Sequence, residues 1–511
     1  MRISLGALHP AMLSALSDTV EPSALSSGAG LPRHATAHLP LVVDLDGTLT
    51  PTDTLVESIV RLVKHHPLLL VLLPFWLLQG RAVLKSRVAR HAPLPVAALP
   101  LRQELVDYLK AEKAHGRTLV LATAAHRSIA DAIAARLPIF DAVLASSEQT
   151  NLKGAAKLAA IRQHYPHGFV YAGDCGADLP IWREAQGAIL VGTPARLGAL
   201  VRRSGVVERE FARTPSGLKT WLKALRVHQW AKNLLLLVPV LTGFAFFEPG
   251  WFGTVALAFL AFSLAASATY LVNDLWDLDS DRAHPRKCKR PFACASIGIA
   301  RGLAVAALLL ASAFVLAGLV SLPFAGMLAL YLVLTSAYSW SLKRYVLVDV
   351  IMLSVLYTLR ILAGAVAIGK PVSSWLLAFS VFVFLGLALV KRCSELVSMQ
   401  QLGLSAAHGR DYRTTDLAVL WPLGCATSVA AVVVFGLFIS APETQSRYAA
   451  PQFLWLSALG LVYWQARMWI KTSRAEMHDD PLVFAIRDAG SRKVIAFILA
   501  TILLAYFVPL A

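Results

Sequence analysis

The segment from Asn273 to Pro291 reads NDLWDLDSDRAHPRKCKRP, beginning with carboxylates and ending with cations. Asn273, Asp277 and Asp281 recur at every fourth residue and Asp274 lies three before Asp277, so a helix would present them on one face. Like charges at this spacing repel, and the repulsion costs more at a membrane edge, so a bound cation explains the cluster. Oxygen ligands that leave coordination positions open suit a magnesium ion carrying a diphosphate.

Cations follow these carboxylates one or two helical turns later. Lys287 and Arg290 can take the phosphate charge that the magnesium ion leaves uncompensated. Asp279 falls off the shared face, so we expect it to be solvated. The alternative is a hydrophilic loop whose charges only form salt bridges with one another.

A second set of candidate residues lies in the first half of the chain. Asp44 and Asp46 end the apolar run LVVDLD, which is typical of the carboxyl end of a parallel strand, where α/β proteins bind ligands. Carboxylates for a hard cation, a lysine for phosphate and a hydroxyl to orient it would together form a phosphate site. The downstream groups of these kinds are Thr123, Lys153, Asp174 and Asp178.

The composition predicts a membrane protein around these sites. Of the 511 residues 57% are hydrophobic and only 15% are charged, where soluble proteins have about a quarter. The chain has 48 basic and 31 acidic residues, and the basic ones lie mainly in short loops between apolar segments. That distribution argues against nucleic acid as a partner. Five scattered cysteines suggest neither a metal site nor a disulfide framework.

Four regions follow from these patterns. Residues 1–38 show no period and are expected to be a flexible lead-in. Residues 39–205 alternate short apolar runs with helical segments, which predicts an α/β, Rossmann-like domain with a small helical cap near 51–100. Residues 206–225 form a linker, and residues 226–511 form an all-α polytopic membrane domain.

Within the cap region, PLLLVLLPFWLLQG (residues 67–80) is apolar for only about a dozen residues, too few to span a bilayer. It is either a buried cap helix or an interfacial helix that leans this domain on the membrane.

The membrane domain contains about nine apolar segments near the roughly 20 residues that cross hydrocarbon. Loops on one side are rich in Lys and Arg, and the opposite loops carry little beyond Lys370 and Arg447. The positive-inside rule therefore puts the α/β domain and the charged loops in the cytoplasm and, for an odd number of spans, the C-terminus outside. The segments lie near 227–247, 251–272, 299–320, 322–341, 346–368, 374–390, 417–440, 452–470 and 494–510.

The first-half motifs, DLDGT and the later GDCGAD, resemble the haloacid dehalogenase (HAD) superfamily of phosphohydrolases over most of residues 39–205. The second motif departs from the Gly and Asn that are common at its third and fifth positions. The resemblance implies that Asp44 attacks phosphorus and that Asp46 protonates the leaving oxygen and then activates water.

The same resemblance implies that Thr123 and Lys153 hold the phosphoryl oxygens, with Lys157 as a second candidate for the lysine. The implied magnesium ligands are Asp44, Asp46, Asp174 and Asp178.

The motif NDxxDxxxD resembles the UbiA superfamily of intramembrane prenyltransferases, across roughly residues 220–511. The resemblance implies magnesium on Asn273, Asp274, Asp277 and Asp281, holding a diphosphate leaving group. Most members carry a second aspartate-rich motif after the sixth span. This chain reads LVKRCSELVSM there, and its cations point to an additional phosphate rather than a second metal; the residues are Lys391, Arg392 and Glu395.

Further motifs, among them HQWAKN, YSWSLKR and GRDYRTTDL, look like the decaprenyl-phosphate phosphoribosyltransferase branch of that superfamily. Those enzymes join phosphoribosyl pyrophosphate (PRPP) to a polyprenyl phosphate and release pyrophosphate, which would give Asp277 and Asp281 catalytic roles. The candidates for binding the substrate phosphates are Lys232, Lys287, Arg290, Lys343, Arg360, Lys391 and Arg392, with Glu395 beside them. Arg360 falls inside an apolar segment, where ionisable groups are costly and usually functional.

A phosphatase on the same chain would then remove the 5-phosphate of the product. Three alternatives stay open: prenyl transfer from a prenyl diphosphate to an aromatic acceptor, a membrane transporter, and a HAD domain that only regulates or tethers. The C-terminal acids Asp479, Asp480 and Asp488 either close the membrane site or belong to an exposed linker.

Overall fold

The structure is a computed structural model, and it describes residues 36–212, 216–403, 410–477 and 480–509. Residues 1–35, most of the expected lead-in, and Asp479 lie outside this part of the chain. The chain divides into two units. One comprises Met1–Leu55, Leu68–Ala97 and Leu101–Thr214, and the other comprises Val56–Pro67, Ala98–Pro100 and Pro215–Ala511.

The first unit is built on a six-stranded sheet in the order β3-β2-β1-β4-β5-β6, with every neighbouring pair parallel. The apolar runs become strands because their side chains are buried on both faces of the sheet. The strands are β1 (Leu41–Val43), β2 (Leu119–His126), β3 (Ala142–Ser146), β4 (Val170–Gly173), β5 (Gly187–Val191) and β6 (Val207–Phe211). This confirms the predicted α/β class.

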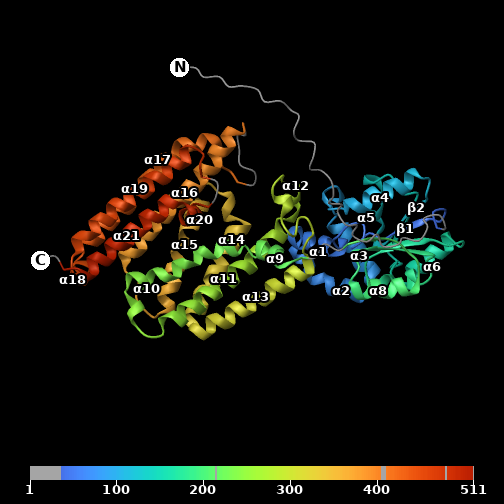
Figure 1. Cartoon of the computed structure of the whole chain (residues 1–511), viewed down its shortest axis with the longest axis horizontal. Helices are drawn as coiled ribbons and strands as arrows, with labels where there is room; N and C mark the ends of the chain where they lie inside the picture. Colours follow the sequence, from blue (N-terminus) through green and yellow to red (C-terminus); the bar gives the residue numbers. More distant parts are fainter. Residues whose placement is uncertain (1–35, 213–215, 404–409, 478–479, 510–511) are drawn as a thin grey trace, which may run out of the picture. The chain divides into compact units, whose positions relative to one another are not determined.

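Strand order reverses at β1, since β2 and β4 pair with its two sides. The loops after these strands therefore diverge around a crevice at the carboxyl edge, which is where α/β sheets bind ligands. Helices cover both faces of the sheet (Figure 1). They are α4 (Gln103–Ala114), α5 (Arg127–Arg136), α6 (Ala155–His164), α7 (Leu179–Trp182) and α8 (Ala195–Ser204).

The cap segment between β1 and α4 is helical, as expected. The stretch Pro67–Leu78 within it is not a buried helix, because Leu68, Val71 and Leu78 are exposed and only Trp76 is buried. An exposed apolar stretch of this kind favours the interfacial reading. The segment contains α1 (Thr54–His65), η1 (Pro67–Leu72), α2 (Leu73–Leu78), α3 (Arg81–His91) and η2 (Val96–Ala98).

The second unit is a bundle of helices, and in the described residues seven are long and apolar enough to cross a membrane. Hydropathy had suggested about nine segments. Residues 227–247 form short pieces instead, and α19 (Leu454–Ser473) is long enough but is not among the seven. The seven are α11 (Trp251–Trp276), α13 (Ile299–Val320), α14 (Leu322–Trp340), α15 (Val348–Ala367), α16 (Ser374–Gln401), the helix Thr414–Ser440 that contains α17 (Leu417–Ser440), and α21 (Ala489–Phe507).

Small side chains allow these helices to approach closely. Ala261 and Ala265 of α11 lie in one buried cluster with Ala317 of α13. Gly364 of α15 leaves room for the broken element η4 (Val227–Leu237), because a Cβ there would lie 2.2 Å from the carbonyl oxygen of Leu236. The first apolar segment is thereby fixed against α15 although it forms no long helix.

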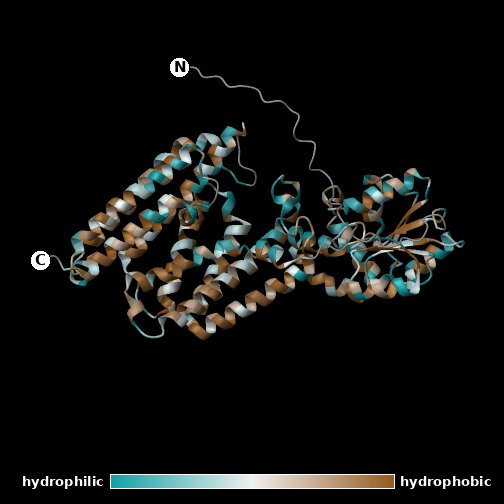
Figure 2. Ribbon diagram, viewed as in Figure 1, coloured by the Kyte–Doolittle hydropathy of each residue, from teal (hydrophilic) through white to brown (hydrophobic). Residues whose placement is uncertain are grey.

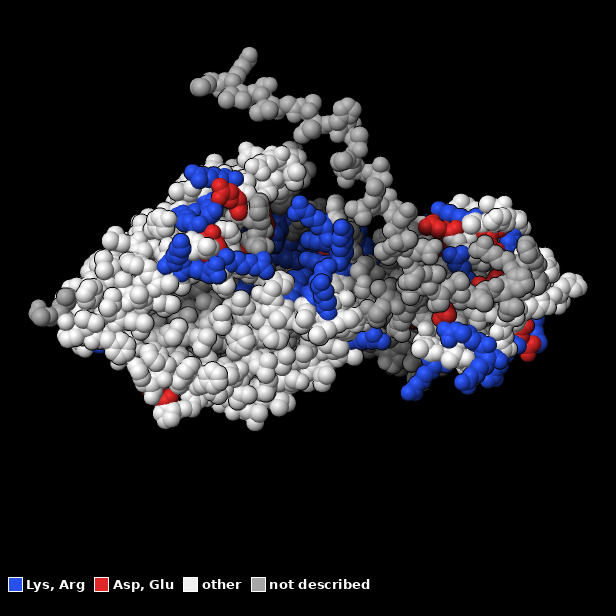
Figure 3. Space-filling view, viewed as in Figure 1, with Lys and Arg blue, Asp and Glu red and all other residues white. Residues whose placement is uncertain are grey.

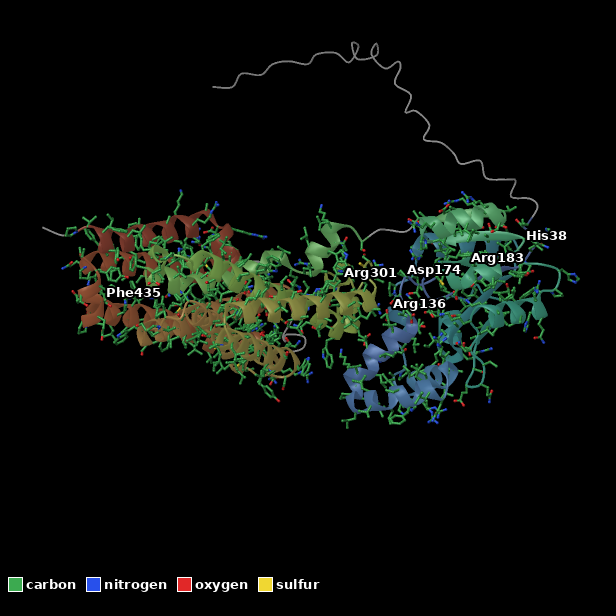
Figure 4. All side chains as sticks on the ribbon, turned by 90° about the horizontal axis from the view of Figure 1, so that it is seen from below. His38, Arg136, Asp174, Arg183, Arg301 and Phe435 are labelled. Atoms are coloured by element: carbon green, nitrogen blue, oxygen red, sulfur yellow. The ribbon has the colours of Figure 1, made fainter. Side chains whose placement is uncertain are left out.

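Polar and apolar surfaces are segregated on this unit. Hydrophobic residues recur along the helices of the bundle (Figure 2), whereas Lys and Arg gather at one end of the face shown in Figure 3. Arg301 at the start of α13 and Phe435 of α17 mark opposite ends of the bundle (Figure 4). This is the pattern of an integral membrane protein with its charged loops on one side.

Candidate functional sites

In the first unit, the loop after β1 places Asp44 beside Lys157 of α6. Lys157 Nζ lies 2.9 Å from Asp44 Oδ1, and both side chains are buried. The backbone N–H of Leu45 also donates to Asp44 Oδ1, at 2.8 Å. Burial raises the pKa of Asp44, while Lys157 opposes the rise. A carboxylate held by one ammonium group in a dry pocket suits a nucleophile.

The lysine at this position is Lys157, the second candidate from the sequence, and not Lys153. Lys153 precedes α6 and is exposed, whereas Lys157 lies in the first turn of α6 and faces the sheet. Lys157 Nζ also donates to the hydroxyl of Tyr171 at 3.0 Å, and that hydroxyl donates to Asp178 Oδ1 at 2.8 Å. Sequence spacing did not separate the two lysines because both lie near the start of the helix.

The acids after β4 fit a magnesium ion. One potential ligand atom from each of Asp174, Cys175 and Asp178 lies within 4.8 Å of the others. Asp174 Oδ1 is buried without a hydrogen-bond partner, and a Cβ on Gly47 would lie 2.3 Å from Asp174 Oδ2. Burial, with the charges of Asp178 and Asp44, raises the pKa of Asp174 to about 7. A hard cation would satisfy the orphan oxygen and relieve this repulsion.

The remaining predicted residues lie around this cluster. Asp46 Oδ1 accepts from the N–H of Thr54 at 2.8 Å, and burial together with Asp53 raises the pKa of Asp46 to about 7, which suits a general acid. Thr123 lies within β2, just before its pairing with β3 becomes irregular, and is fully buried; its Oγ1 accepts from the N–H of Ala125 at 3.0 Å.

Sequence reasoning missed Lys85 of the cap helix α3. Its Nζ donates to the carbonyl of Ala124 at 2.5 Å and to Asn151 Oδ1 at 2.7 Å. Burial lowers its pKa, and Asp46 is the first charge that opposes the shift. No motif in the cap sequence had pointed to it.

In the second unit, Asp277 ends α11 and is followed directly by α12 (Leu278–Ala283), so the acids lie on two helices rather than one. Asp274 and Asp281 are buried and share Arg290, whose Nη1 lies 3.2 and 2.6 Å from their carboxylate oxygens. Arg226 binds the same oxygen of Asp274, Oδ1, at 2.5 Å. The two predicted acids are therefore close together and already neutralised.

Arg226 was not predicted. It lies just before η4 with φ 50°, a left-handed conformation that is uncommon outside glycine, and its guanidinium also packs on the ring of Tyr270. Its sequence neighbourhood, RVHQW, gave no sign of a link to α11.

Asp277 is the more accessible acid, and it faces a group of cations. Lys343 Nζ lies 3.8 Å from Asp277 Oδ2. Burial lowers the pKa of Lys343, Asp277 opposes the shift, and three further cations add to it: Arg410, Arg344 and Lys287. Asn273 Nδ2 donates to Ser339 Oγ at 3.2 Å. Carboxylate and amide oxygens are ligands that magnesium prefers, and the nearby cations suit phosphate. Among the described residues, however, only Asp174, Cys175 and Asp178 of the first unit have ligand atoms that all lie within 4.8 Å of one another, so the three acids of the second unit are less tightly grouped.

Two predicted cations are engaged inside the bundle. Arg360 donates to Asn233 Oδ1 at 3.0 Å, to the hydroxyl of Tyr331 at 3.0 Å and to the carbonyl of Leu356 at 2.6 Å. This network offsets the cost of burying the Arg360 guanidinium, so its position inside the bundle can be explained without a functional role.

Arg392 is fully buried and forms ion pairs with Asp349 and Glu395. The hydroxyl of Tyr412 donates to the other Asp349 oxygen, at 2.5 Å. Glu395 also pairs with Arg410, at 3.1 Å. Sequence reading could not find Asp349 as the partner because it lies on a different helix, α15.

Lys232 and Lys391 come together on Asp480. Their Nζ atoms lie 2.7 and 3.1 Å from Asp480 Oδ2. Asp480 precedes α20 (Pro481–Arg487), so the C-terminal segment does reach predicted substrate-binding residues of the bundle and is not merely an exposed linker.

Comparison with known proteins identifies both units. A model described as the UbiA prenyltransferase family matches residues 236–486, and one described as haloacid dehalogenase-like hydrolase matches residues 41–183. The chain belongs to the UbiA prenyltransferase family and carries a HAD domain. Both predicted resemblances are thereby confirmed.

Relatives differ in how much of this UbiA–HAD chain they match. Protein y4nM of Sinorhizobium fredii is 39% identical over 474 residues, which is 91% of each chain. Nodulation protein NoeC of Azorhizobium caulinodans is 35% identical over 53% of this chain and 88% of its own. Decaprenyl-phosphate phosphoribosyltransferase of Corynebacterium glutamicum is 33% identical over 44% of this chain and 69% of its own. Similarity to that transferase thus covers less than half of this chain.

Proposed function

We propose that the UbiA unit joins PRPP to a polyprenyl phosphate, giving polyprenyl-phosphoryl-5-phosphoribose and pyrophosphate, and that the HAD unit removes the 5-phosphate. The observation that carries the first half is the surplus of cations around one acidic cluster: Asp277 faces Lys343, with Lys287, Arg344 and Arg410 contributing to the same field. PRPP carries three phosphate groups and the lipid carries a fourth, so a site that binds both needs several cations. The similarity to decaprenyl-phosphate phosphoribosyltransferase of Corynebacterium glutamicum supports the same assignment.

In the UbiA unit, Asn273, Asp274, Asp277 and Asp281 would hold magnesium, which supplies neutralising charge to the departing pyrophosphate. Arg226 and Arg290, released from Asp274 and Asp281 when the cation binds, would bind phosphate oxygens. Stabilisation of the leaving group allows positive charge to develop at the ribosyl carbon, which the lipid phosphate then attacks. Lys343 and Lys287 would hold the 5-phosphate.

In the HAD unit, Asp44 would attack the phosphorus of the 5-phosphate, and Asp46 would donate its proton to the ribose oxygen that leaves. Asp46 would then take a proton from the water that hydrolyses the aspartyl-phosphate. Lys157 and Thr123 would hold the phosphoryl oxygens, and magnesium on Asp44 and Asp174 would offset their charge. We place this unit and the charged end of the bundle on the cytoplasmic side.

The test is mass spectrometry of the lipid after incubation of the purified chain in detergent with magnesium and a polyprenyl phosphate, with PRPP added or withheld. We expect a lipid that gains phosphoribose and then loses one phosphate only when Asp44 is intact. Absence of any mass change, with turnover of a prenyl diphosphate and an aromatic acid instead, would contradict the proposal and assign ordinary prenyl transfer. Phosphoribose transfer followed by no loss of phosphate would contradict only the HAD half.

A further inference from the structure

A small pocket in the UbiA unit has an apolar wall and one charged end. Side chains of α15, α16 and α20, among them Leu353, Leu387 and Leu482, line it. The pocket is narrow and opens to the outside, and its space of about 230 Å³ includes open solvent. Lys391 and Asp480 lie at its polar end.

The charged end is built like a site for a phosphate oxygen. Asp480 Oδ2 accepts from Lys232 Nζ at 2.7 Å and from Lys391 Nζ at 3.1 Å. The hydroxyl of Tyr357 lies 3.4 Å from each carboxylate oxygen. Burial alone would raise the pKa of Asp480, but Lys391 and Lys232 hold it well below its usual range. Two ammonium groups around one acid leave a net positive charge.

The two sides of this contact come from different parts of the bundle. Lys232 lies on η4 next to Asn233, which is buried, bound by Arg360 at 3.0 Å and hydrogen-bonded to Ser263 at 3.0 Å. Asp480, by contrast, is the N-cap of the seven-residue helix α20. The lysine is therefore fixed by the bundle, while the acid reaches it from a short segment.

We propose that this pocket binds the phosphate of the lipid substrate, and that Asp480 occupies the phosphate position until the lipid displaces it. The inference rests on the proposed function for the identity of the lipid. An apolar wall suits the first carbons of a prenyl chain and not a ribose, and two lysines match a phosphate monoester better than a single carboxylate. The lipid phosphate must therefore compete with the Asp480 carboxylate for the two lysines.

If Asp480 competes with the lipid phosphate, removing its charge should increase the affinity for the lipid. A ligand that must displace a resident group has its affinity reduced by the fraction of sites still free. Asp480→Asn removes the charge but keeps an N-cap side chain, so the lysines become available. Asp488→Asn is the matched control, because Asp488 also caps a helix, α21, and pairs with a cation, Arg467, that is not part of this pocket.

The experiment measures binding of farnesyl phosphate to the full-length protein in detergent by calorimetry, with farnesol and inorganic phosphate as parallel probes. We expect farnesyl phosphate to bind about tenfold more tightly to Asp480→Asn than to the unmodified protein or to Asp488→Asn. Lys391→Gln should weaken binding by about tenfold or more, which tests the site even if Asp480→Asn fails to fold. Farnesol should bind weakly to every variant.

Equal or weaker binding of farnesyl phosphate to Asp480→Asn would overturn the proposal, because Asp480 would then position the lysines or play no part. Tight binding of inorganic phosphate with no gain from the farnesyl chain would also overturn it. None of these measurements needs PRPP. A protein that shows the Asp480→Asn effect but transfers no phosphoribose would therefore contradict the proposed reaction alone.

Discussion

The two acidic sites solve the same electrostatic problem in different ways. In the HAD unit, Asp44 and Asp178 share one buried lysine, Lys157, and Asp174 Oδ1 has no hydrogen-bond partner. In the UbiA unit, Asp274 and Asp281 are each held by arginine. The first site keeps a deficit of positive charge that a cation would relieve, whereas in the second site Asp274 and Asp281 are already balanced by Arg226 and Arg290. This balance suits a site that must take up and release a large polyanion together with its metal.

The largest expected effect separates the two sites. Asp44→Asn should abolish release of phosphate, lowering its rate by about 10⁴-fold or more, because the amide cannot form the aspartyl-phosphate. Formation of the phosphoribosyl lipid should continue at the same rate. Mass spectrometry of the lipid and a phosphate assay on one sample measure both. Loss of both activities would break the comparison, because it would mean that the sites do not act independently.

The second site is proposed to exchange its arginine partners for a cation, and Asp277, its more accessible acid, allows a test. Asp277→Asn should lower transfer by about 10³-fold, since it removes a proposed metal ligand and the acid that faces Lys343. Asp279→Asn is the control, because Asp279 lies outside the proposed ligand set. It is not simply solvated as expected but pairs with Arg61 at 2.5 Å, and because the pair is partly exposed the variant should stay within about threefold. Similar losses of transfer activity in both variants would indicate that the acidic segment has only a structural role.

The single lysine of the HAD site can be tested against its neighbour. Lys157→Met should lower phosphatase turnover by about 10²-fold, because the Asp44 carboxylate loses its only buried cation partner among the described residues. Lys153→Met removes an exposed side chain and should change turnover less than about threefold. The reverse ranking, measured as kcat/KM on a sugar phosphate, would show that the lysines exchange roles when substrate binds.

Much of this architecture could be predicted from local patterns. Continuous apolar runs gave the buried strands, and the strand-end acids Asp44 and Asp174 were assigned because parallel strands bring their carboxyl ends to one edge. The partners of the charged groups could not be predicted. Arg226–Asp274, Arg392–Asp349 and Lys232–Asp480 join residues that are far apart in the sequence, and only packing of the helices determines which cation meets which acid.

Broken segments were the other difficulty. Residues 227–247 have the hydropathy of a span but form η4, α10 (Val238–Thr242) and η5 (Ala245–Phe247). Hydropathy reports how apolar a segment is and not whether it forms one continuous helix. Pro239 and Gly243 interrupt this segment. Arg360 was predicted as a substrate ligand for a related reason, since the sequence does not show that Asn233 and Tyr331 already satisfy its donors.

The smallest expected effect on activity distinguishes structural ion pairs from exchangeable ones. Arg392 and Asp349 are both fully buried, so Arg392→Met would leave an uncompensated carboxylate and should cost about 3–5 kcal/mol of stability. Arg290 is itself partly exposed, and magnesium can neutralise the two buried acids that Arg290→Met leaves without this partner, so the melting temperature of the variant should recover when magnesium is added. Thermal unfolding in detergent with and without magnesium measures this contrast. If magnesium restores the melting temperature of Arg392→Met, Asp349 belongs among the metal ligands. If stability is lost without recovery and the KM for PRPP is unchanged in the folded fraction, Arg392 belongs to the framework of the bundle.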